Sequence, residues 1–261
     1  MIKLLLPLLT ILFFISCQKQ ISTDKASEEV AKAKFTICHY DAVSGTSKTI
    51  QVAQNALAGH LAHGDLQGDC SAVLVTICDQ DWMVKNLDVD HYRNGDPIPQ
   101  VTDLTAWVGL TTGAWCYYEN NSVNGRIYGK LYNWHAVNDS RGLAPVGWHV
   151  PSYNELRTLQ DCLGGYFVAG GKMKATTLWN SPNTGATNES GFTGLPGGGR
   201  SGYVGTFNAV NEWGYFLSST EHISGDIWLG LLVNDNAHFH LSTVNKTTGL
   251  SVRCVRNWDN F

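Results

Sequence analysis

Residues 144–156 read APVGWHVPSYNEL, and they contain the start of the one convincing amphipathic helix in the chain. Ser152 is a typical N-cap residue and Glu155 follows three positions later, so the pair predicts a capping box. Leucines then recur at helical spacing and predict a buried stripe: Leu156, Leu159 and Leu163. Two consecutive glycines follow, so the pattern predicts one helix over residues 152–165.

The segments on both sides of this helix predict short strands joined by long loops. Aromatic and β-branched runs, bounded by Gly, Asn and Pro, occur at residues 75–79, 114–119, 128–134, 214–219, 226–233, 237–243 and 250–256. Charged residues make up only 15% of the chain, while it has 27 glycines and 9 tryptophans, which favours loops stabilised by aromatic packing. No repeat of fixed period is evident. We therefore predict an α+β fold with few helices.

The N-terminal segment predicts export and a lipid anchor. Residues 1–16 contain one lysine and then an apolar run that is too short to span a membrane, which is typical of a signal peptide. The small residue before Cys17 resembles a bacterial lipoprotein cleavage site, so we expect Cys17 to carry the lipid; an uncleaved membrane anchor is the alternative. Residues 17–33 predict a solvated tether. The expected location is the cell envelope, with the membrane contacted through a lipid anchor at the outer membrane.

The charge pattern argues against a nucleic-acid partner. The formal net charge is -4, and lysines and arginines form no cluster along the chain. Proteins that bind nucleic acid need a basic patch to neutralise phosphates. Nucleic acid is therefore excluded from the expected partners.

Residues 34–72 predict a small separate unit. A strand over residues 34–38, a turn, a second strand over 48–53 and a helix over 54–64 give a ββα pattern. On that helix Leu57 and Leu61 share one face. A unit of about 40 residues needs a disulfide or a metal ion to be stable.

Three explanations of the cysteines and histidines in this unit stay open. A Cys38–Cys70 disulfide would close a loop of about 33 residues and contribute on the order of 3 to 4 kcal/mol, and export favours it. Alternatively, a zinc ion would take nitrogen donors from three histidines, with an aspartate nearby: His39, His60, His63 and Asp65. A catalytic Cys/His pair is the least favoured explanation, because it needs a reduced thiolate.

Six ordered blocks in the rest of the chain carry a family resemblance. They are QDWMVKNLDV (80–89), YGKLYNWHAV (128–137), APVGWHVPSYNEL (144–156), ESGFTGLPGGGR (189–200), YFLSSTE (215–221) and GLSVRCVR (249–256). Together they resemble the Fibrobacter succinogenes major paralogous domain family, which we place at residues 73–257. That family is similar to the C-type-lectin-like superfamily, so the resemblance implies a C-type-lectin-like domain with short strands, long loops and few helices.

The resemblance also bears on the cysteines. Once Cys17 is set aside, an even number remains, which favours disulfides in an exported protein: Cys38, Cys70, Cys78, Cys116, Cys162 and Cys254. C-type-lectin-like folds often link their first helix to the last strand. The resemblance therefore implies a Cys162–Cys254 disulfide, and Cys78–Cys116 is the remaining pair.

The function expected from the resemblance is binding. We expect a lipid-anchored surface protein that recognises a glycan or a protein, because exposed aromatic and amide side chains suit such ligands. Residues of this kind in the C-terminal half are the candidates: Tyr203, Phe207, Asn211, Trp213, Trp228, Asn234, Asp235, Asn236 and His238. The tripeptides that bind calcium and sugar in true C-type lectins are absent. No cofactor is required, and a structural calcium or zinc ion stays open.

Two other functions are alternatives. An exported enzyme would be a metal-assisted hydrolase or an oxidase related to the formylglycine-generating enzymes, but no catalytic motif is present, so we expect no enzyme activity. His135 and His149 are expected to be packing residues, since no carboxylate is seen to converge on them in the sequence. The other alternative is a receptor diversified by a retroelement, which a template repeat in the genomic DNA would reveal.

Overall fold

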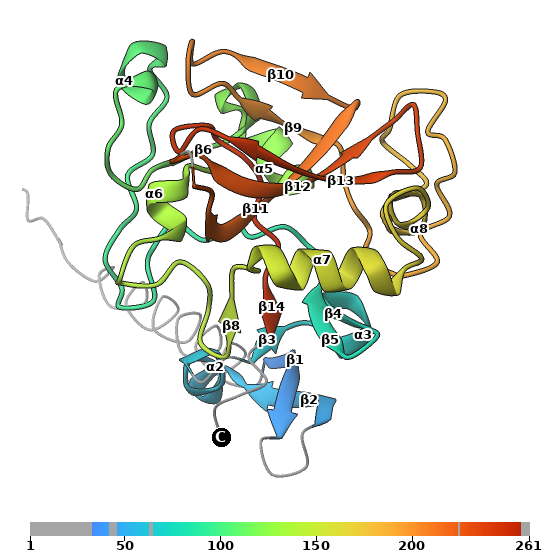
Figure 1. Ribbon diagram of the computed structural model, residues 1–261. Coiled ribbons are helices and arrows are strands. Elements are labelled where there is room, and N and C mark those ends of the chain that lie inside the picture. The colour runs from blue at the N-terminus through green and yellow to red at the C-terminus, as the bar shows by residue number, and fades with distance from the viewer. Residues whose placement is uncertain (1–32, 42–45, 63–64, 224, 257–261) are drawn as a thin grey trace, which may run out of the picture.

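The structure, a computed structural model, describes residues 33–41, 46–62, 65–223 and 225–256 (Figure 1). The predicted signal peptide, Cys17, nearly all of the predicted tether and His63 lie outside these residues. In the part that is described, no helix has the length and apolar character needed to cross a membrane.

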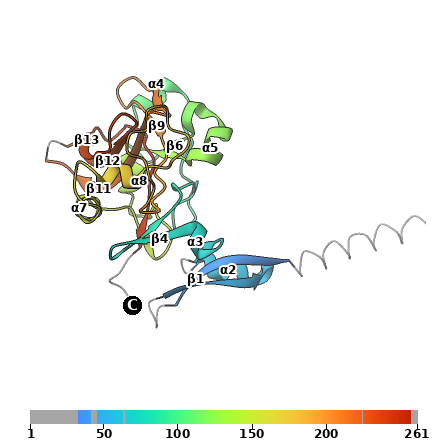
Figure 2. The same ribbon diagram turned by 90° about the vertical axis from the view of Figure 1, so that its right-hand side faces the viewer.

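The N-terminal unit folds as a hairpin followed by a helix, so the predicted ββα order is confirmed. β1 (Lys34–Asp41) pairs antiparallel with β2 (Thr46–Ala53), and α2 (Gln54–Ala62) follows directly. The short β3 (Leu66–Gln67) adds to the other edge of β1, giving the strand order β2-β1-β3. α3 (Cys70–Val73) leads out of the unit (Figure 2). We call residues 34–73 the Cys/His module.

The predicted Cys38–Cys70 disulfide is present and closes the Cys/His module. It joins β1 to the start of α3, and it excludes a catalytic role for the Cys38 thiol because both sulfurs are bonded. Among the described residues of the module, three hydrophobic ones are buried: Ile37, Cys38 and Val52. α2 contributes no buried residue to them, and Leu61 is 40% exposed. The leucine face of α2 therefore does not enter a core.

The larger part of the chain begins with a four-stranded antiparallel sheet. Its strands are β4 (Leu74–Ile77), β5 (Gln80–Met83), β8 (Trp148–His149) and β14 (Val255–Arg256), in the order β4-β5-β14-β8. β14 is the last strand of the described chain and lies between β5 and β8. The sheet thus joins the end of the described chain to its first strands after the module.

A second, three-stranded sheet is separated from the four-stranded sheet by the helix whose start lies in residues 144–156. β11 (Trp213–Glu221), β12 (Ile227–Val233) and β13 (Phe239–Val244) form it in antiparallel order. α7 (Tyr153–Cys162) runs between this sheet and the four-stranded sheet (Figure 1). Side chains of α7 and both sheets share one apolar cluster, which holds the three layers together.

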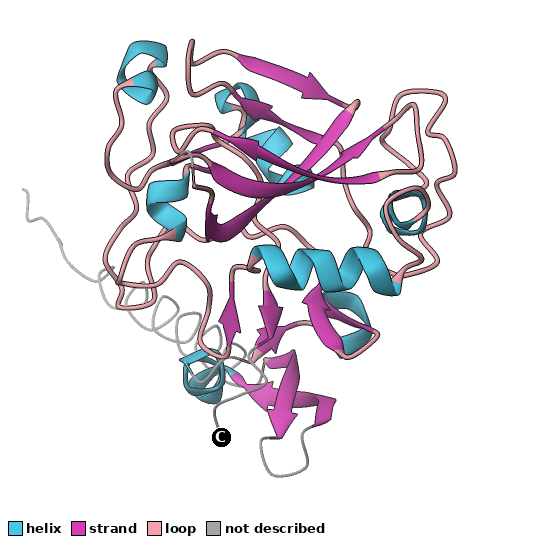
Figure 3. Ribbon diagram, in the orientation of Figure 1, coloured by secondary structure: helices cyan, strands magenta, loops and turns pink. Residues whose placement is uncertain are grey.

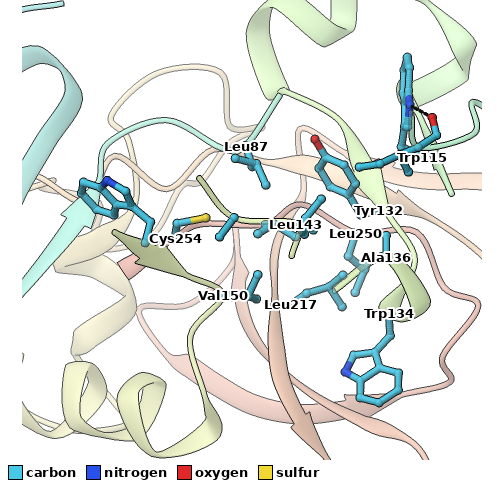
Figure 4. Packing of buried hydrophobic residues seen from close by; sticks show 14 of the residues in the cluster. Leu87, Trp115, Tyr132, Trp134, Ala136, Leu143, Val150, Leu217, Leu250 and Cys254 are labelled. Atoms are coloured by element: carbon cyan, nitrogen blue, oxygen red, sulfur yellow. Dashed lines mark hydrogen bonds between the residues drawn. The ribbon is translucent and has the colours of Figure 1, made fainter. Parts of the chain in front are cut away.

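Short helices and two-stranded ladders complete the fold (Figure 3). They are α4 (Leu104–Val108), β6 (Trp115–Cys116), η1 (Tyr118–Asn120), α5 (Ser122–Tyr128), β7 (Leu131–Tyr132), α6 (Trp134–Val137), α8 (Ala169–Met173), β9 (Gly197–Arg200) and β10 (Phe207–Val210). A further apolar cluster, rich in aromatic rings, packs inside this region (Figure 4). The fold consists mainly of strands with a few short helices, which agrees with the predicted α+β class.

Buried cationic side chains fasten the long loops to this frame. The Arg200 guanidinium donates to the carbonyl oxygens of residues 101, 102, 103 and 205 at 2.7 to 3.0 Å. The Arg253 guanidinium donates to three carbonyl oxygens and to Asn86 Oδ1. Lys174 Nζ donates to three more carbonyl oxygens, at 2.8 to 2.9 Å. Each of these three side chains is at most 1% exposed, so backbone oxygens satisfy charges that would otherwise be unpaired.

The predicted Cys162–Cys254 and Cys78–Cys116 pairs are wrong. Cys162, at the end of α7, is bonded to Cys78 in the turn between β4 and β5. Cys116 and Cys254 are free and buried. The reason lies in the alternation along the last strand: Val255 enters the cluster beneath α7, so Cys254 points to the other side, into the cluster that contains Trp148.

The capping box predicted at the start of α7 is confirmed. Ser152 Oγ accepts from the Glu155 backbone N–H, and the Glu155 carboxylate accepts from the Ser152 backbone N–H at 2.7 Å. Replacing Ser152 with alanine should lower the free energy of unfolding by about 1 kcal/mol, because the Glu155 N–H loses its acceptor and the Glu155 carboxylate loses the Ser152 hydroxyl as a donor. Urea denaturation measures the change. Asn154→Ala, an exposed position in the same turn, is the control and should stay within about 0.5 kcal/mol; equal changes in both variants would contradict the prediction.

Candidate functional site

A groove of about 310 Å³ lies beside α7, where the helix meets the second sheet and the loop that follows it. Its lining residues are Tyr153, Arg157, Gln160, Asp161, Tyr166, Trp228 and Leu241. Figure 1 shows α7 running along the sheet that contains β12 and β13. Three of the lining side chains are aromatic, and two others, Arg157 and Asp161, carry exposed charges.

The helix period places three of these side chains on one exposed face of α7. Tyr153, Arg157 and Asp161 are each four residues apart, while Leu156 and Leu159 point into the core. Arg157 Nε donates to both carboxylate oxygens of Asp161, at 3.1 and 3.0 Å. One aromatic ring and one ion pair of zero net charge therefore face the groove from the helix.

Strand alternation brings the tryptophan to the same groove. Ile227 and Leu229 of β12 are buried in the aromatic-rich cluster, so Trp228 between them points to the other face of the sheet. Its ring lies 4.4 Å from the Tyr153 ring, centroid to centroid. The His222 ring contacts the same indole edge-on at 5.0 Å. Trp228 is half-buried, so part of its ring remains accessible from the groove.

Four more rings gather beside the edge strand β13, and one of them, Tyr166, also lines the groove. Tyr166 lies 4.7 Å from His238 and 5.1 Å from His240, and Phe167 lies 5.3 Å from His238. The two histidine rings are 5.4 Å apart, because residues two apart along an extended chain lie on one face. Phe167 is 71% exposed. We call Tyr166, Phe167, His238 and His240 the aromatic edge.

One member of the aromatic edge, His240, is held in its neutral form. Burial lowers the pKa of His240, and the neighbouring His238 lowers it further. Tyr166 Oη and His240 Nδ1 form a hydrogen bond of 3.0 Å. The groove and the edge together thus offer flat rings, a hydroxyl group and one neutral ion pair, a combination that can stack against and hydrogen-bond an uncharged polar ligand.

Comparison with known proteins decides the family of the chain. The model of the Fibrobacter succinogenes major domain matches residues 75–256. The chain belongs to the Fibrobacter succinogenes major paralogous domain family. No curated protein and no solved structure matches it. The family name carries no activity, so a function has to be argued from the side chains.

The sequence blocks of the Fibrobacter succinogenes major domain mainly build its frame. Arg200 ends one block and Arg253 lies in another, and both are buried and bonded to loop carbonyls. The groove residues Arg157, Tyr166 and Trp228 lie outside all six blocks. Of the aromatic residues that line the groove, only Tyr153 lies within a block, so the resemblance identifies the scaffold more than the groove.

The nine predicted ligand-binding residues do not form a single site in the family domain. Trp228 lines the groove, and His238 belongs to the aromatic edge. Tyr203, 74% exposed, lines a separate cavity of about 170 Å³ near Arg200. Trp213 is also exposed, but its ring packs edge-on against Tyr215.

The other five predicted residues support the loops. The Phe207 ring packs against Tyr118 and the Arg200 guanidinium. Asn211 Oδ1 accepts from the Tyr128 hydroxyl at 2.8 Å. The remaining three hold the turn between β12 and β13 through their side chains: Asn234 donates to the Ser181 carbonyl oxygen, Asn236 accepts from the His238 N–H, and Asp235 accepts from Asn236. The side chains of these residues are therefore engaged in hydrogen bonds or ring packing within the domain, and their presence does not require a ligand.

Two of the three predicted metal ligands meet in the Cys/His module. His39 and His60 both contact the carboxylate of Asp65, and these three residues form the one group of metal-binding type among the residues described. Burial raises the pKa of Asp65, but hydrogen bonds from His39, from the Tyr40 N–H and from His60 outweigh it, so the net pKa is lowered. The carboxylate is therefore ionised at neutral pH. The third predicted ligand, His63, lies outside the described residues.

A carboxylate that the sequence analysis missed converges on His149. His149 Nε2 lies 2.7 Å from Glu155 Oε1, and Glu155 Oε2 accepts from Ser152. Burial raises the pKa of Glu155, but the bonds from His149 and Ser152 lower it overall. Both carboxylate oxygens are thus engaged in fixing the start of α7. His135, by contrast, packs edge-on against Trp134, and burial lowers its pKa.

The helix and the loop after it supplied the groove residues that sequence reasoning missed. Tyr153, Arg157 and Asp161 recur at a spacing of four on the polar face of the predicted helix, and an aromatic pair, Tyr166 and Phe167, follows the two glycines that end it. These two signals together could have indicated a binding surface. A larger cavity of about 610 Å³ between residues 84–88 and 125–129 contains no aromatic side chain, so it lacks the stacking surfaces of the groove.

Proposed function

We propose that this protein binds an uncharged polysaccharide or oligosaccharide in the groove between α7 and β12. The observation that carries the proposal is that three aromatic rings, Trp228, Tyr153 and Tyr166, line one groove together with the Arg157–Asp161 pair. Ring faces stack on the C–H faces of sugars, and the guanidinium and carboxylate donate to and accept from hydroxyl groups.

The balance of charge favours a neutral ligand. The positive charge of Arg157 and the negative charge of Asp161 cancel in the groove, and the whole chain has a net charge of -4. An anionic polymer would meet no cationic cluster there, while burial keeps His240 uncharged at neutral pH. Recognition would rest on stacking and on hydroxyl hydrogen bonds, both of which depend little on salt.

The wider setting of this binding is also part of the proposal. We infer a C-type-lectin-like fold, which the short strands, the long loops and the single long helix against a three-stranded sheet support. We also infer a lipid anchor at Cys17 in the outer membrane, which the apolar run and the small residue before Cys17 support. A domain held at the cell envelope in this way would present its groove to extracellular or envelope glycans.

A titration with neutral and acidic polysaccharides tests the proposal. Tryptophan fluorescence and calorimetry should detect saturable binding of at least one neutral polymer among β-glucan, mannan, xylan and chitin oligosaccharides, and none of alginate or heparin. Trp228→Ala and Tyr166→Ala should each weaken that binding at least about tenfold, equivalent to ~1.4 kcal/mol, because each removes a stacking face.

The matched controls are Trp213→Ala and Tyr203→Ala, which remove exposed rings outside the groove. Both should bind as the unmodified protein does. Absence of binding to every neutral polymer would contradict the proposal, and loss confined to the Tyr203 variant would move the site to the cavity near Arg200. Binding only of alginate or heparin would show that charge, and not stacking, governs recognition.

A further inference from the structure

Two histidines from different elements of the Cys/His module point at one carboxylate oxygen. His39 Nδ1 of β1 and His60 Nδ1 of α2 each lie 2.8 Å from Asp65 Oδ2. The donor atoms of all three residues lie within 4.8 Å of one another. Side chains that converge in this way need only small rotations to surround one metal ion, since zinc bonds to nitrogen and carboxylate oxygen are about 2.0 to 2.2 Å long.

The carboxylate is buried and fixed in direction. The Asp65 side chain is 1% exposed, and its second oxygen, Oδ1, accepts from the Tyr40 backbone N–H at 3.0 Å. The His39 and His60 side chains are 26% and 23% exposed, and their rings meet edge-on. A carboxylate held by the backbone, with two half-accessible imidazoles against it, is a pre-arranged set of ligands that an ion can still reach from solvent.

Apolar packing alone attaches α2 only weakly to the rest of the module. α2 has no buried residue, so apolar burial does not hold it to the hairpin. The contacts that join its C-terminal part to the following segment include the His60–Asp65 pair and a hydrogen bond from the Asp65 N–H to the His60 carbonyl oxygen. A small unit with few buried hydrophobic residues gains proportionally most from a bound ion.

The chemistry of the donors selects the kind of ion. The Cys38–Cys70 disulfide removes both thiolates, so two imidazole nitrogens and one carboxylate oxygen remain. This set suits a divalent transition metal such as zinc, whose remaining position water can fill. It does not suit calcium, which takes six to eight oxygen ligands. We propose that His39, His60 and Asp65 bind one zinc-class ion, which ties α2 to β1 and β3.

A zinc titration of the full chain tests this proposal. Calorimetry with a competing chelator, and metal analysis after dialysis, should show one zinc ion per chain and no response to calcium. His39→Ala, His60→Ala and Asp65→Asn should each weaken binding on the order of 100-fold or more, because loss of an outer-shell partner alone costs about 10- to 100-fold.

The matched control is His91→Ala. His91 Nδ1 also lies 2.7 Å from a carboxylate oxygen, that of Asp90, but the pair is exposed and includes no second histidine. This variant should bind zinc as the unmodified protein does. Unchanged zinc affinity in the His60 variant, or equal loss in the His91 variant, would overturn the proposal.

A second measurement separates metal binding from simple misfolding of a variant. Zinc should slow backbone hydrogen exchange in residues 54–62 of the unmodified protein, and a chelator should reverse the change. The exchange of α7 should stay constant, because α7 lies outside the module. If zinc and chelator leave residues 54–62 unaffected, the three side chains form a hydrogen-bonded network only, and the metal site is rejected whatever the result for carbohydrate binding.

Discussion

Replacing Arg253 with methionine should lower the free energy of unfolding by about 4 kcal/mol or more, a large fraction of the total stability of a typical domain. The guanidinium donates to the carbonyl oxygens of Met83, Phe192 and Thr193 and to Asn86 Oδ1. Methionine fills a similar volume but donates nothing, so acceptors in two segments, residues 83–86 and 192–193, lose their partner. Each such loss costs roughly 1 to 3 kcal/mol.

The burial of the arginine itself works in the opposite direction. Burial lowers the pKa of Arg253 to about 9, which shows that its charge is held in an unfavourable medium, although it stays protonated at neutral pH. Removal of that charge returns part of the loss. We expect the unpaired acceptors to dominate, because the flat guanidinium also packs against the rings of Phe192 and Phe216.

Chemical denaturation of three variants measures the effect. Arg253→Met should lose the most, and Arg253→Lys should also be destabilised, because an ammonium group cannot reproduce the planar set of five donors. Arg157→Met is the control: its pair with Asp161 is exposed, and such i, i+4 pairs are worth about 0.3 to 0.5 kcal/mol. Similar midpoints for the methionine variants at 253 and 157 would contradict this account of the buried arginine.

Removal of the Cys38–Cys70 disulfide should unfold the Cys/His module while the rest of the chain stays folded. The disulfide closes a loop of about 33 residues, and its loss should destabilise the module by roughly 3 to 4 kcal/mol. The buried hydrophobic residues of the module are few, and one of them is Cys38 itself. Little remains to oppose the entropy of this segment in a Cys38→Ala, Cys70→Ala double variant.

Hydrogen exchange with peptide resolution distinguishes local from global unfolding. Residues 34–53 should exchange much faster in the double variant, while α7 should keep its protection. A Cys78→Ala, Cys162→Ala double variant serves as the comparison, because it removes the disulfide at the end of α7 and should leave residues 34–53 protected. Retained protection of residues 34–53 in the first variant would show that the module has a sufficient core without its disulfide.

The features that the sequence predicted correctly depend on local patterns. The cap of α7, the ββα order of the module and most strands follow from the spacing of a few neighbouring residues. The Cys162–Cys254 pairing failed because it depends on which face of β14 is turned toward α7, a property of the folded layers. The groove was missed for a similar reason, since Trp228 and Tyr166 are brought together by strands and loops far apart in the chain.

In the candidate metal site, too, the local pattern was predicted and the contact between separate segments was not. His39 and His60 were identified from composition and spacing, but the carboxylate that joins them was only noted as nearby. Its role depends on β3, which turns the chain back along β1 and carries Asp65 beneath both rings. Two residues of strand pairing are too short a pattern to be predicted from the sequence.

The buried cations of the long loops have a consequence for how the protein could vary. Arg200, Arg253 and Lys174 bind mainly carbonyl oxygens, which every amino acid provides. These cations therefore fasten the loops by their main chain, so exposed side chains that make no bond within the loops are relieved of a role in shape. A library that randomises exposed loop positions while keeping these three residues should yield many folded members. The domain would then serve as a display framework for new binding specificities.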